Sequence, residues 1–291
     1  FATYTGELQK AGYKTGYTGK GWSPGKLAPG GRSENPAGTS YAKRNLQPPF
    51  KAIRNTDYAG NFDDFLDAVE KEAPFCFWLG TSEPHRAYEK GAGKRTGKDP
   101  AKVIVPSIFP DNAIVRSDIL DYYVEVEHFD LMVERAIASL EKRGHLDNTI
   151  VVVTSDHGMP FPRAKASLYD WGSRVPLAIR WPRGIRNPGR DVKDFVHLSD
   201  LAPTFIEAAG ADVPSMMTAS SLMKIFSGQK MNDRDAAYFA MERHDGCREG
   251  GKGYPCRAVR TQDYLYIYNF EPGRWPSGSP DPRVCARSIP F

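Results

Sequence analysis

Apolar residues recur along several segments of the chain at the spacing of amphipathic helices. In one segment the apolar stripe follows i, i+3, i+4 and i+7, with the members Phe62, Phe65, Leu66 and Val69. Asn61 precedes this stripe and is predicted as the helix N-cap. A longer helix is predicted to begin at Ser117 and to end near Gly144, and its stripe consists of Val126, Phe129, Val133, Ile137 and Leu140. Two shorter helices are expected at residues 5–11 and 199–209.

Short apolar runs between these helices predict strands at 13–18, 75–80, 149–154 and 175–181. The run 149–154 is β-branched and continuous, which is typical of a central parallel strand covered on both faces. Residues 21–60 and 86–116 are predicted as long loops. After residue 235 the pattern changes to short strands and turns.

The alternation of strands and helices predicts an α/β fold, with a mixed, largely parallel central sheet flanked by helices and a small β-rich C-terminal part. We place the α/β domain at residues 1–235 and the β-rich subdomain at 236–291. The chain opens on Phe1 inside a helical pattern and stops abruptly at Phe291, so we expect the natural protein to extend beyond both ends.

Composition narrows the functional classes. Of the 291 residues, 39 are basic and 35 acidic, and the net charge of +4 is too small and too dispersed for a nucleic-acid-binding surface. No apolar run reaches the roughly 18 residues of a membrane span. Cys76 lies in an apolar run and is predicted to be buried, whereas Cys247 and Cys256 are close enough in sequence for a disulfide. The chain has no CxxC pair, which is the pattern that would indicate a zinc site.

Residues that can carry chemistry follow three of the predicted strands. Asp156 and His157 come directly after the run 149–154, where a carboxylate and an imidazole can bind a divalent cation. Lys20, His85 and Lys165 follow other strands or the same loop, and fixed cations at one sheet edge would balance a tetrahedral oxyanion. Taken singly, each of these residues also fits a solvated loop or a turn. Their common position at strand ends favours one shared site.

Three motifs resemble the sulfatase family of the alkaline-phosphatase superfamily. They are the segment 8–20 (LQKAGYKTGYTGK), the block from Thr154-Ser-Asp-His-Gly to Gly-Ser-Arg-Val-Pro176, and the helix His197-Leu-Ser-Asp-Leu-Ala-Pro-Thr-Phe-Ile206. The resemblance covers about residues 5–270. Within the family, Glu83-Pro-His-Arg86, Pro160-Phe-Pro162 and Glu242-Arg-His-Asp245 look most like the N-sulfoglucosamine sulfohydrolases.

This resemblance implies one calcium ion with Asp156 and His157 as two of its ligands. It implies that Lys20, His85 and Lys165 hold sulfate oxygens or transfer a proton to the leaving group. The implied nucleophile is a hydrated formylglycine that attacks sulfur. Arg243 and His244 are candidates for binding an acidic sugar, although a charged Gly-rich loop is also simply exposed. A secreted, periplasmic or lysosomal location follows from the family alone.

Two features depart from the family pattern. Trp22 stands where many members have a histidine, two residues after the lysine. The paired aspartates and the C/S-x-P/A-x-R motif that carries formylglycine belong upstream of Thr5, so we expect both in a segment that precedes this chain. Asp63-Asp64 imitates the aspartate pair but lies in a predicted helix, and Cys256-Arg-Ala-Val-Arg260 imitates the nucleophile motif in the β-rich part. We interpret both as coincidences.

The sequence therefore predicts a calcium-dependent sulfatase that acts on sulfated glycosaminoglycan sugars, by cleaving sulfate esters or N-sulfate groups. A phosphate-ester hydrolase of the same superfamily is a second hypothesis, although such an enzyme usually binds two zinc ions and the chain has only six histidines. A third is a catalytically inactive chain that binds sulfated glycans. No nucleic acid partner is expected, and the oligomeric state stays open.

Overall fold

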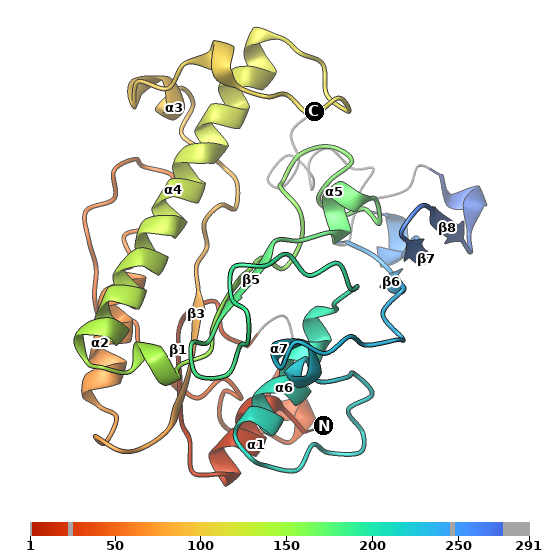
Figure 1. Cartoon of the computed structure of the whole chain (residues 1–291). Helices are drawn as coiled ribbons and strands as arrows, with labels where there is room; N and C mark the ends of the chain where they lie inside the picture. Colours follow the sequence, from red (N-terminus) through yellow and green to blue (C-terminus); the bar gives the residue numbers. More distant parts are fainter. Residues whose placement is uncertain (1, 23–25, 245–247, 276–291) are drawn as a thin grey trace.

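A computed structural model describes residues 2–22, 26–244 and 248–275. The described part contains three small sheets and one long helix, α4, which runs along one side of the molecule (Figure 1). Cys247 and Cys285 lie outside the described residues.

The first sheet has the order β2-β1-β3 and is entirely parallel. It consists of β1 (Lys14–Gly19), β2 (Thr39–Ser40) and β3 (Phe75–Gly80). Two of these strands match the predicted ranges closely, whereas β2 lies inside the segment predicted as a loop. Gly19 has a φ of +68°, and a Cβ built there would lie 2.1 Å from the carbonyl oxygen of Gly80. Only glycine allows the ends of β1 and β3 to approach this closely.

Two helices cover this sheet, and the core lies between them and the strands. The main apolar cluster contains Phe62, Phe65 and Leu66 from α2 (Tyr58–Asp67), together with Leu140 and Leu146. The predicted cap was wrong, because α2 begins one turn earlier. Asp57 is its N-cap and accepts a hydrogen bond from the Gly60 N–H, whereas Asn61 is buried within the helix and accepts one from the Arg44 N–H.

Helix α4 (Ala113–Lys142) also begins earlier than predicted, with Asn112 rather than Ser117 at its start. Its buried face is partly polar: Asp121, Glu125 and His128 are at most 5% exposed. The Asp121 carboxylate accepts hydrogen bonds from the N–H groups of Gly91 and Gly93 and so holds the start of α3 (Ala92–Arg95). The apolar stripe predicted for this helix is consequently only half-buried over most of its length.

The second sheet pairs β4 (Val151–Thr154) with β5 (Leu177–Arg180). The pairing is antiparallel, so the expectation of a parallel partner for β4 is wrong among the described strands. Between the two strands runs a compact loop that ends in α5 (Asp170–Ser173). Helices α1 (Tyr4–Lys10) and α6 (Leu201–Ala208) contact each other below the sheets, and α7 (Met223–Phe226) packs nearby.

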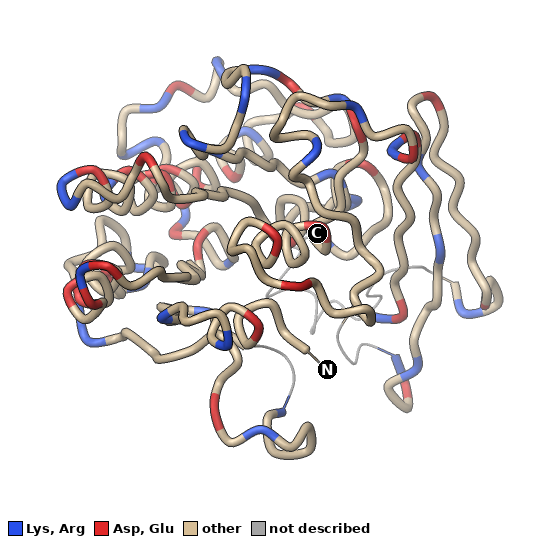
Figure 2. Tube along the Cα trace, turned by 60° about the horizontal axis from the view of Figure 1, so that its bottom comes forward, with Lys and Arg blue, Asp and Glu red and all other residues tan. Residues whose placement is uncertain are grey.

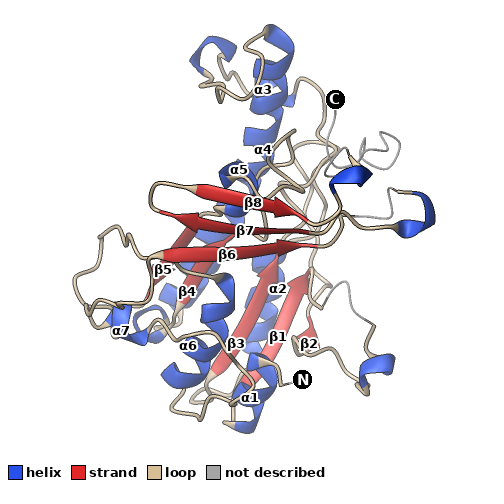
Figure 3. Cartoon of the chain, turned by 90° about the vertical axis from the view of Figure 1, so that its right-hand side faces the viewer, coloured by secondary structure: helices blue, strands red, loops and turns tan. Residues whose placement is uncertain are grey.

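The third sheet is an antiparallel meander whose strands run across the direction of the other strands in the view of Figure 3. It consists of β6 (Ala236–Met241), β7 (Cys256–Thr261) and β8 (Leu265–Asn269). The β-rich C-terminal part is therefore confirmed, while the domain boundary at 235 stays a prediction. Short 3-10 helices occupy the ranges 28–30, 100–102, 146–148, 198–200, 249–251 and 272–274.

Surface charge is mixed, because lysines and arginines alternate with acidic residues along the trace (Figure 2). Within the described ranges, no helix has both the length and the apolar character needed to cross a membrane.

Burial of Glu125 makes stability depend on pH. Burial, together with the smaller effect of the Glu83 charge, raises the pKa of this carboxyl from 4.5 to about 8. The folded protein therefore binds one more proton than the unfolded chain between these values, so the free energy of unfolding falls as pH rises through that window.

We expect Glu125→Gln to remove this penalty, because glutamine cannot ionise. The variant should gain about 2 kcal/mol over the parent at pH 8 and much less at pH 5. Thermal unfolding of both proteins across this range measures the difference. Glu127→Gln, at an exposed position on the same helix, is the control. Parallel pH profiles for Glu125→Gln and the parent would contradict the assignment.

Candidate active site

Lys20 is held at the end of β1 by backbone contacts to the neighbouring strand. Its N–H donates to the carbonyl of Gly80 at 2.7 Å, and its own carbonyl accepts the indole N–H of Trp78 at 2.7 Å. Both contacts depend on the close approach at Gly19. The lysine side chain is exposed and lines a cavity that also contains His85.

His85 lies in the turn that follows β3, and one hydrogen bond fixes its tautomer. Its N–H donates to the carbonyl of Ser82, whose own N–H donates to the Tyr58 hydroxyl. The ring Nδ1 is 2.5 Å from the carbonyl oxygen of Arg86 and must carry the proton to donate to it. Nε2 therefore presents its lone pair outward in the neutral ring.

The ammonium group of Lys165 faces that lone pair, with Nζ 3.3 Å from His85 Nε2. Lys165 is only 5% exposed. Its loop is compact, since the Lys165 N–H donates to the carbonyl of Met159. Arg163 and Ala166 flank the lysine with φ values of +61° and +62°. Such left-handed backbone is uncommon outside glycine and often occurs where a side chain is held for function.

Three nearby cations or protonatable groups act on the His85 ring. Partial desolvation lowers the pKa of His85, and the positive charges of Lys165 and Lys20 and the neighbouring His157 lower it further. The hydrogen bond to the Arg86 carbonyl opposes this shift. His85 is therefore neutral near pH 7 in this arrangement. The structure therefore brings together four of the predicted site residues: Lys20, His85, His157 and Lys165.

Arg86 joins the loop that carries His85 to the loop that carries Lys165. Its guanidinium donates to both oxygens of Asp118 on α4, at 2.9 and 2.5 Å, and to the carbonyl of Pro160 at 2.8 Å. Its guanidinium carbon lies 4.4 Å from the ring centroid of Tyr88 and 4.7 Å from that of Phe161. The side chain is 8% exposed, so the ion pair is largely shielded from water. One feature of the sequence could have indicated this role, the arginine directly after the candidate histidine.

Asp156 and His157 lie side by side after β4, with His157 Nε2 3.6 Å from Asp156 Oδ1. His157 Nδ1 is 2.8 Å from the carbonyl of Gly158, the hydrogen bond that usually orients a metal-binding imidazole. Nε2 and the carboxylate can therefore face a common cation. Calcium takes six to eight ligands, mostly oxygens, and no group of three or more His, Cys, Asp or Glu side chains suited to a metal occurs in the described ranges. These residues fit part of a calcium site and do not complete one.

The two candidate substrate-binding residues are not brought to this cavity. Arg243 and His244 follow β6, and neither lines the cavity of Lys20 and His85. The exposed Arg243 guanidinium donates to the carbonyl of Gly251. Their proposed role in substrate binding stays a prediction without a contact to support it.

The two stretches that imitate family motifs, Asp63-Asp64 and the one that begins at Cys256, have structural roles. Asp63 accepts hydrogen bonds from Ser139 and Arg143, and Asp64 binds Arg44, so this pair ties α2 to its surroundings. Cys256 begins β7, is 3% exposed and is a free thiol whose pKa is raised by burial. Its expected disulfide partner, Cys247, lies outside the described residues. Cys76 is a free thiol as well, and burial raises its pKa to about 12.

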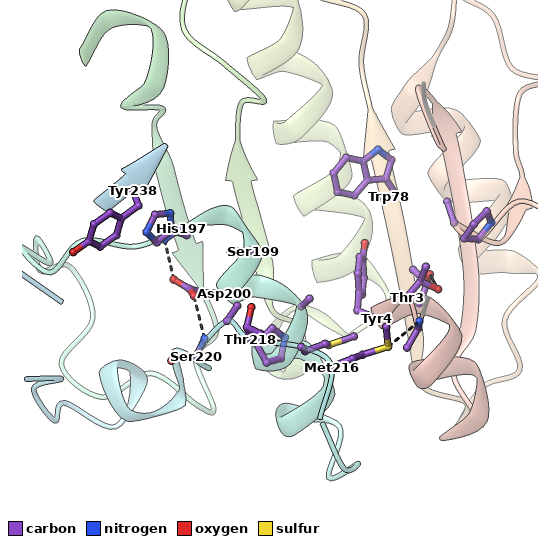
Figure 4. A pocket seen from close by; sticks show the side chains of 18 of the residues that line it. Thr3, Tyr4, Trp78, His197, Ser199, Asp200, Met216, Thr218, Ser220 and Tyr238 are labelled. Atoms are coloured by element: carbon purple, nitrogen blue, oxygen red, sulfur yellow. Dashed lines mark hydrogen bonds between the residues drawn. The ribbon is translucent and has the colours of Figure 1, made fainter. Parts of the chain in front are cut away.

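A larger cavity of about 810 Å³ lies on the other side of Lys20, between α1, α6 and β6 (Figure 4). Trp22 and Trp78 line it, and Asp200 lies at its polar end. The Asp200 carboxylate accepts hydrogen bonds from the N–H groups of His197 and Ser220 and pairs with the buried Arg234. Since this carboxylate is engaged on both oxygens, it holds loops together and is not poised for acid–base chemistry.

The chain is similar to known proteins over most of its length. The sulfatase family model matches residues 7–211, and a model described as N-sulphoglucosamine sulphohydrolase, C-terminal, matches residues 160–275. The chain is 26% identical over 232 residues to N-sulphoglucosamine sulphohydrolase of Homo sapiens, covering 69% of this chain and 45% of the relative. It is 28% identical over 245 residues to an ulvan-active sulfatase of Formosa agariphila, covering 80% of this chain and 39% of the relative.

Solved structures share the fold. One, in complex with its substrate D-glucosamine-2-N,6-O-disulfate, has a TM-score of 0.69 at 21% identity and covers 99% of this chain and 76% of the other. A phosphonate monoester hydrolase from Silicibacter pomeroyi has a TM-score of 0.64 at 18% identity, with coverage of 98% and 77%. The predicted α/β fold class is thereby confirmed. The chain spans less than half the length of the first curated relatives. Since the family model covers most of the chain, this protein belongs to the sulfatase family.

Proposed function

We propose that this protein is a sulfatase that removes sulfate from sulfated glycosaminoglycan sugars, as an O-ester or as an N-sulfate. The observation that carries the proposal is the convergence of Lys20, His85 and Lys165 at the ends of separate chain segments. Support for the substrate class comes from the similarity to N-sulphoglucosamine sulphohydrolase and from the fold shared with a structure that holds a sulfated glucosamine.

In this proposal the two lysines bind the sulfate. Lys165 is buried and Lys20 is anchored to β3, so both ammonium groups are held before the substrate arrives. Fixed cations in a partly dry site stabilise the oxygens of a sulfuryl group as negative charge builds on them. Nζ of Lys165 lies 3.3 Å from Nε2 of His85, which supports a sulfate bound by this lysine within reach of the imidazole.

His85 is proposed to protonate the leaving group. Partial burial, together with the charges of the two lysines, lowers the pKa of His85 and keeps the ring neutral near pH 7. A bound sulfate anion offsets those charges and so favours the imidazolium, whose Nε2–H can be donated to the departing oxygen or nitrogen when its bond to sulfur breaks. Nδ1 stays bonded to the Arg86 carbonyl throughout, which keeps the ring in one orientation.

A calcium ion and a formylglycine are part of the proposal by family resemblance. Asp156 and His157 would hold the ion together with ligands beyond the described residues, and the bound ion would add positive charge next to the sulfate oxygens. We place the formylglycine nucleophile in a segment that precedes Phe1. A secreted, periplasmic or lysosomal location is proposed on the same basis.

Two other functions predict different outcomes. A phosphate-ester hydrolase is the second candidate, favoured only by the fold it shares with the phosphonate monoester hydrolase, and it would release phosphate rather than sulfate. A glycan-binding chain without activity would bind sulfated sugars and release nothing.

Loss of the catalytic side chains should abolish sulfate release by the intact protein. We expect His85→Ala and Lys165→Ala each to lower kcat/KM for N-sulfoglucosamine by about 10²–10⁴-fold, since a positioned proton donor and a fixed cation are lost. Ion chromatography of released sulfate measures the effect. Lys193→Ala, at an exposed loop position, should retain full activity. Undiminished turnover in both active-site variants would refute the assigned roles.

Removal of the Lys165 charge should raise the pKa of His85. We expect Lys165→Met to move the titration of the His85 ring to higher pH, because one of the positive charges that disfavours the imidazolium is gone. The ring Cε1–H chemical shift, followed by NMR as pH is varied, reports this directly in the chain itself. A titration that stays in place or moves to lower pH would argue against the contact between the two side chains.

Arg86 is expected to position His85 against Lys165 without touching the substrate. Arg86→Ala should cost about 3 kcal/mol of stability, because it leaves the Asp118 carboxylate unpaired in a half-buried position. It should also shift the NMR titration of His85, which a change in stability alone would not do. The double variant with Asp118→Ala should recover part of the stability. An unchanged His85 titration in a folded Arg86→Ala protein would limit Arg86 to a structural role.

A further inference from the structure

The cavity that contains Lys20 and His85 also contains a cation that the proposed chemistry does not use. The cavity has a volume of about 270 Å³, and its basic lining residues are Lys20, Arg54, His85 and Arg86. This volume lies at the small end of ligand pockets, roughly 300–1,000 Å³. The space is therefore suited to one sugar ring, and any further ring of the substrate would lie at its mouth.

The two arginines of this cavity differ in how their guanidinium groups are engaged. Arg86 donates to Asp118 and Pro160 and lies between two aromatic rings, so its donors and its charge are used within the protein. Arg54 is exposed, and no hydrogen bond or ion pair joins its guanidinium to another side chain or backbone group of the described ranges. Its five N–H donors are available to a ligand.

The backbone of Arg54 is nevertheless fixed relative to His85. The Arg54 N–H donates to Glu83 Oε1 at 2.9 Å, and Glu83 is 6% exposed and lies two residues before His85. The preceding residue, Ile53, is 2% exposed and packs against Ala92 and Val124. A buried carboxylate and an apolar anchor therefore set the distance between the Arg54 backbone and the loop of His85.

We propose that Arg54 is a specificity-determining residue that binds a second anionic group of the substrate, a sulfate or a carboxylate, while Lys20, Lys165 and His85 hold the sulfate that is cleaved. The inference rests on the proposed function and narrows its substrate class to sugars with two negative groups. An arginine fork matches the planar carboxylate and two sulfate oxygens equally well, because both accept paired N–H donors. Lys20, which lies in the same cavity, links the two binding positions.

The test is calorimetric binding to the full chain, which requires no turnover. The ligands are inorganic sulfate, glucosamine N-sulfate, D-glucosamine-2-N,6-O-disulfate, and a disaccharide of N-sulfoglucosamine with a uronic acid. We expect Arg54→Ala to weaken the doubly charged ligands about tenfold and to leave inorganic sulfate and the singly sulfated sugar unchanged. The ligand that loses most identifies the second group as sulfate or as carboxylate.

Two further variants complete the experiment. Arg54→Lys keeps the charge without the fork and should lose only part of the affinity. Lys51→Ala removes an exposed cation three residues away and should change nothing. Thermal unfolding of each variant establishes that it is folded.

The outcomes separate this inference from the function on which it rests. If Arg54→Ala weakened the binding of all four ligands equally, Arg54 would belong to the site of the cleaved sulfate. If it weakened the binding of none of them, Arg54 would have no role in substrate binding. Either result overturns the inference while sulfate binding by the parent chain still stands. A parent chain that binds none of the four ligands would overturn the inference and the proposed function together.

Discussion

The arrangement depends on a buried ammonium group held against a neutral imidazole, Lys165 Nζ facing His85 Nε2 at 3.3 Å. Neither group neutralises the other, and Lys20 adds a further positive charge nearby. Two lysine charges beside one imidazole disfavour its protonation, and an incoming anion would offset those charges. The fold must therefore supply the energy that keeps these groups together. That energy comes from contacts outside the cluster, chiefly the Arg86–Asp118 pair and the close approach of Gly19 to Gly80.

The sequence predicted the strand ends well, because their apolar runs are short and bounded by turn residues. The ranges predicted for β1 and β3 agree with the structure to within a few residues. The residues that follow these strands, Lys20 and His85, therefore lie at one edge of a sheet. This prediction requires only the local pattern of apolar residues and turn residues. For this reason the sequence could predict that four site residues are neighbours: Lys20, His85, His157 and Lys165.

Other features depend on contacts that no local pattern encodes. Asp121 of α4 is buried because its carboxylate accepts hydrogen bonds from the backbone of a loop about 30 residues earlier in the chain. The helix caps were misplaced for a similar reason: Asn61 satisfies the backbone of Arg44 rather than its own helix. Arg54 and Arg86 both lie in segments that the sequence predicts as loops. Only the position of Asp118 on a distant helix distinguishes the one that is saturated from the one that is available.

The division of labour between these two arginines has a physical basis in burial. A guanidinium that is 8% exposed must be paired, since leaving it unpaired would cost several kcal/mol, so Arg86 can organise two loops but cannot also serve a ligand. An exposed guanidinium bears no such penalty and gains from binding only when a ligand replaces its water with paired acceptors. Glu83 makes this possible without neutralising the side chain, because its carboxylate engages the Arg54 backbone N–H. One buried acid thus fixes the place of a cation while leaving its charge for an incoming anion.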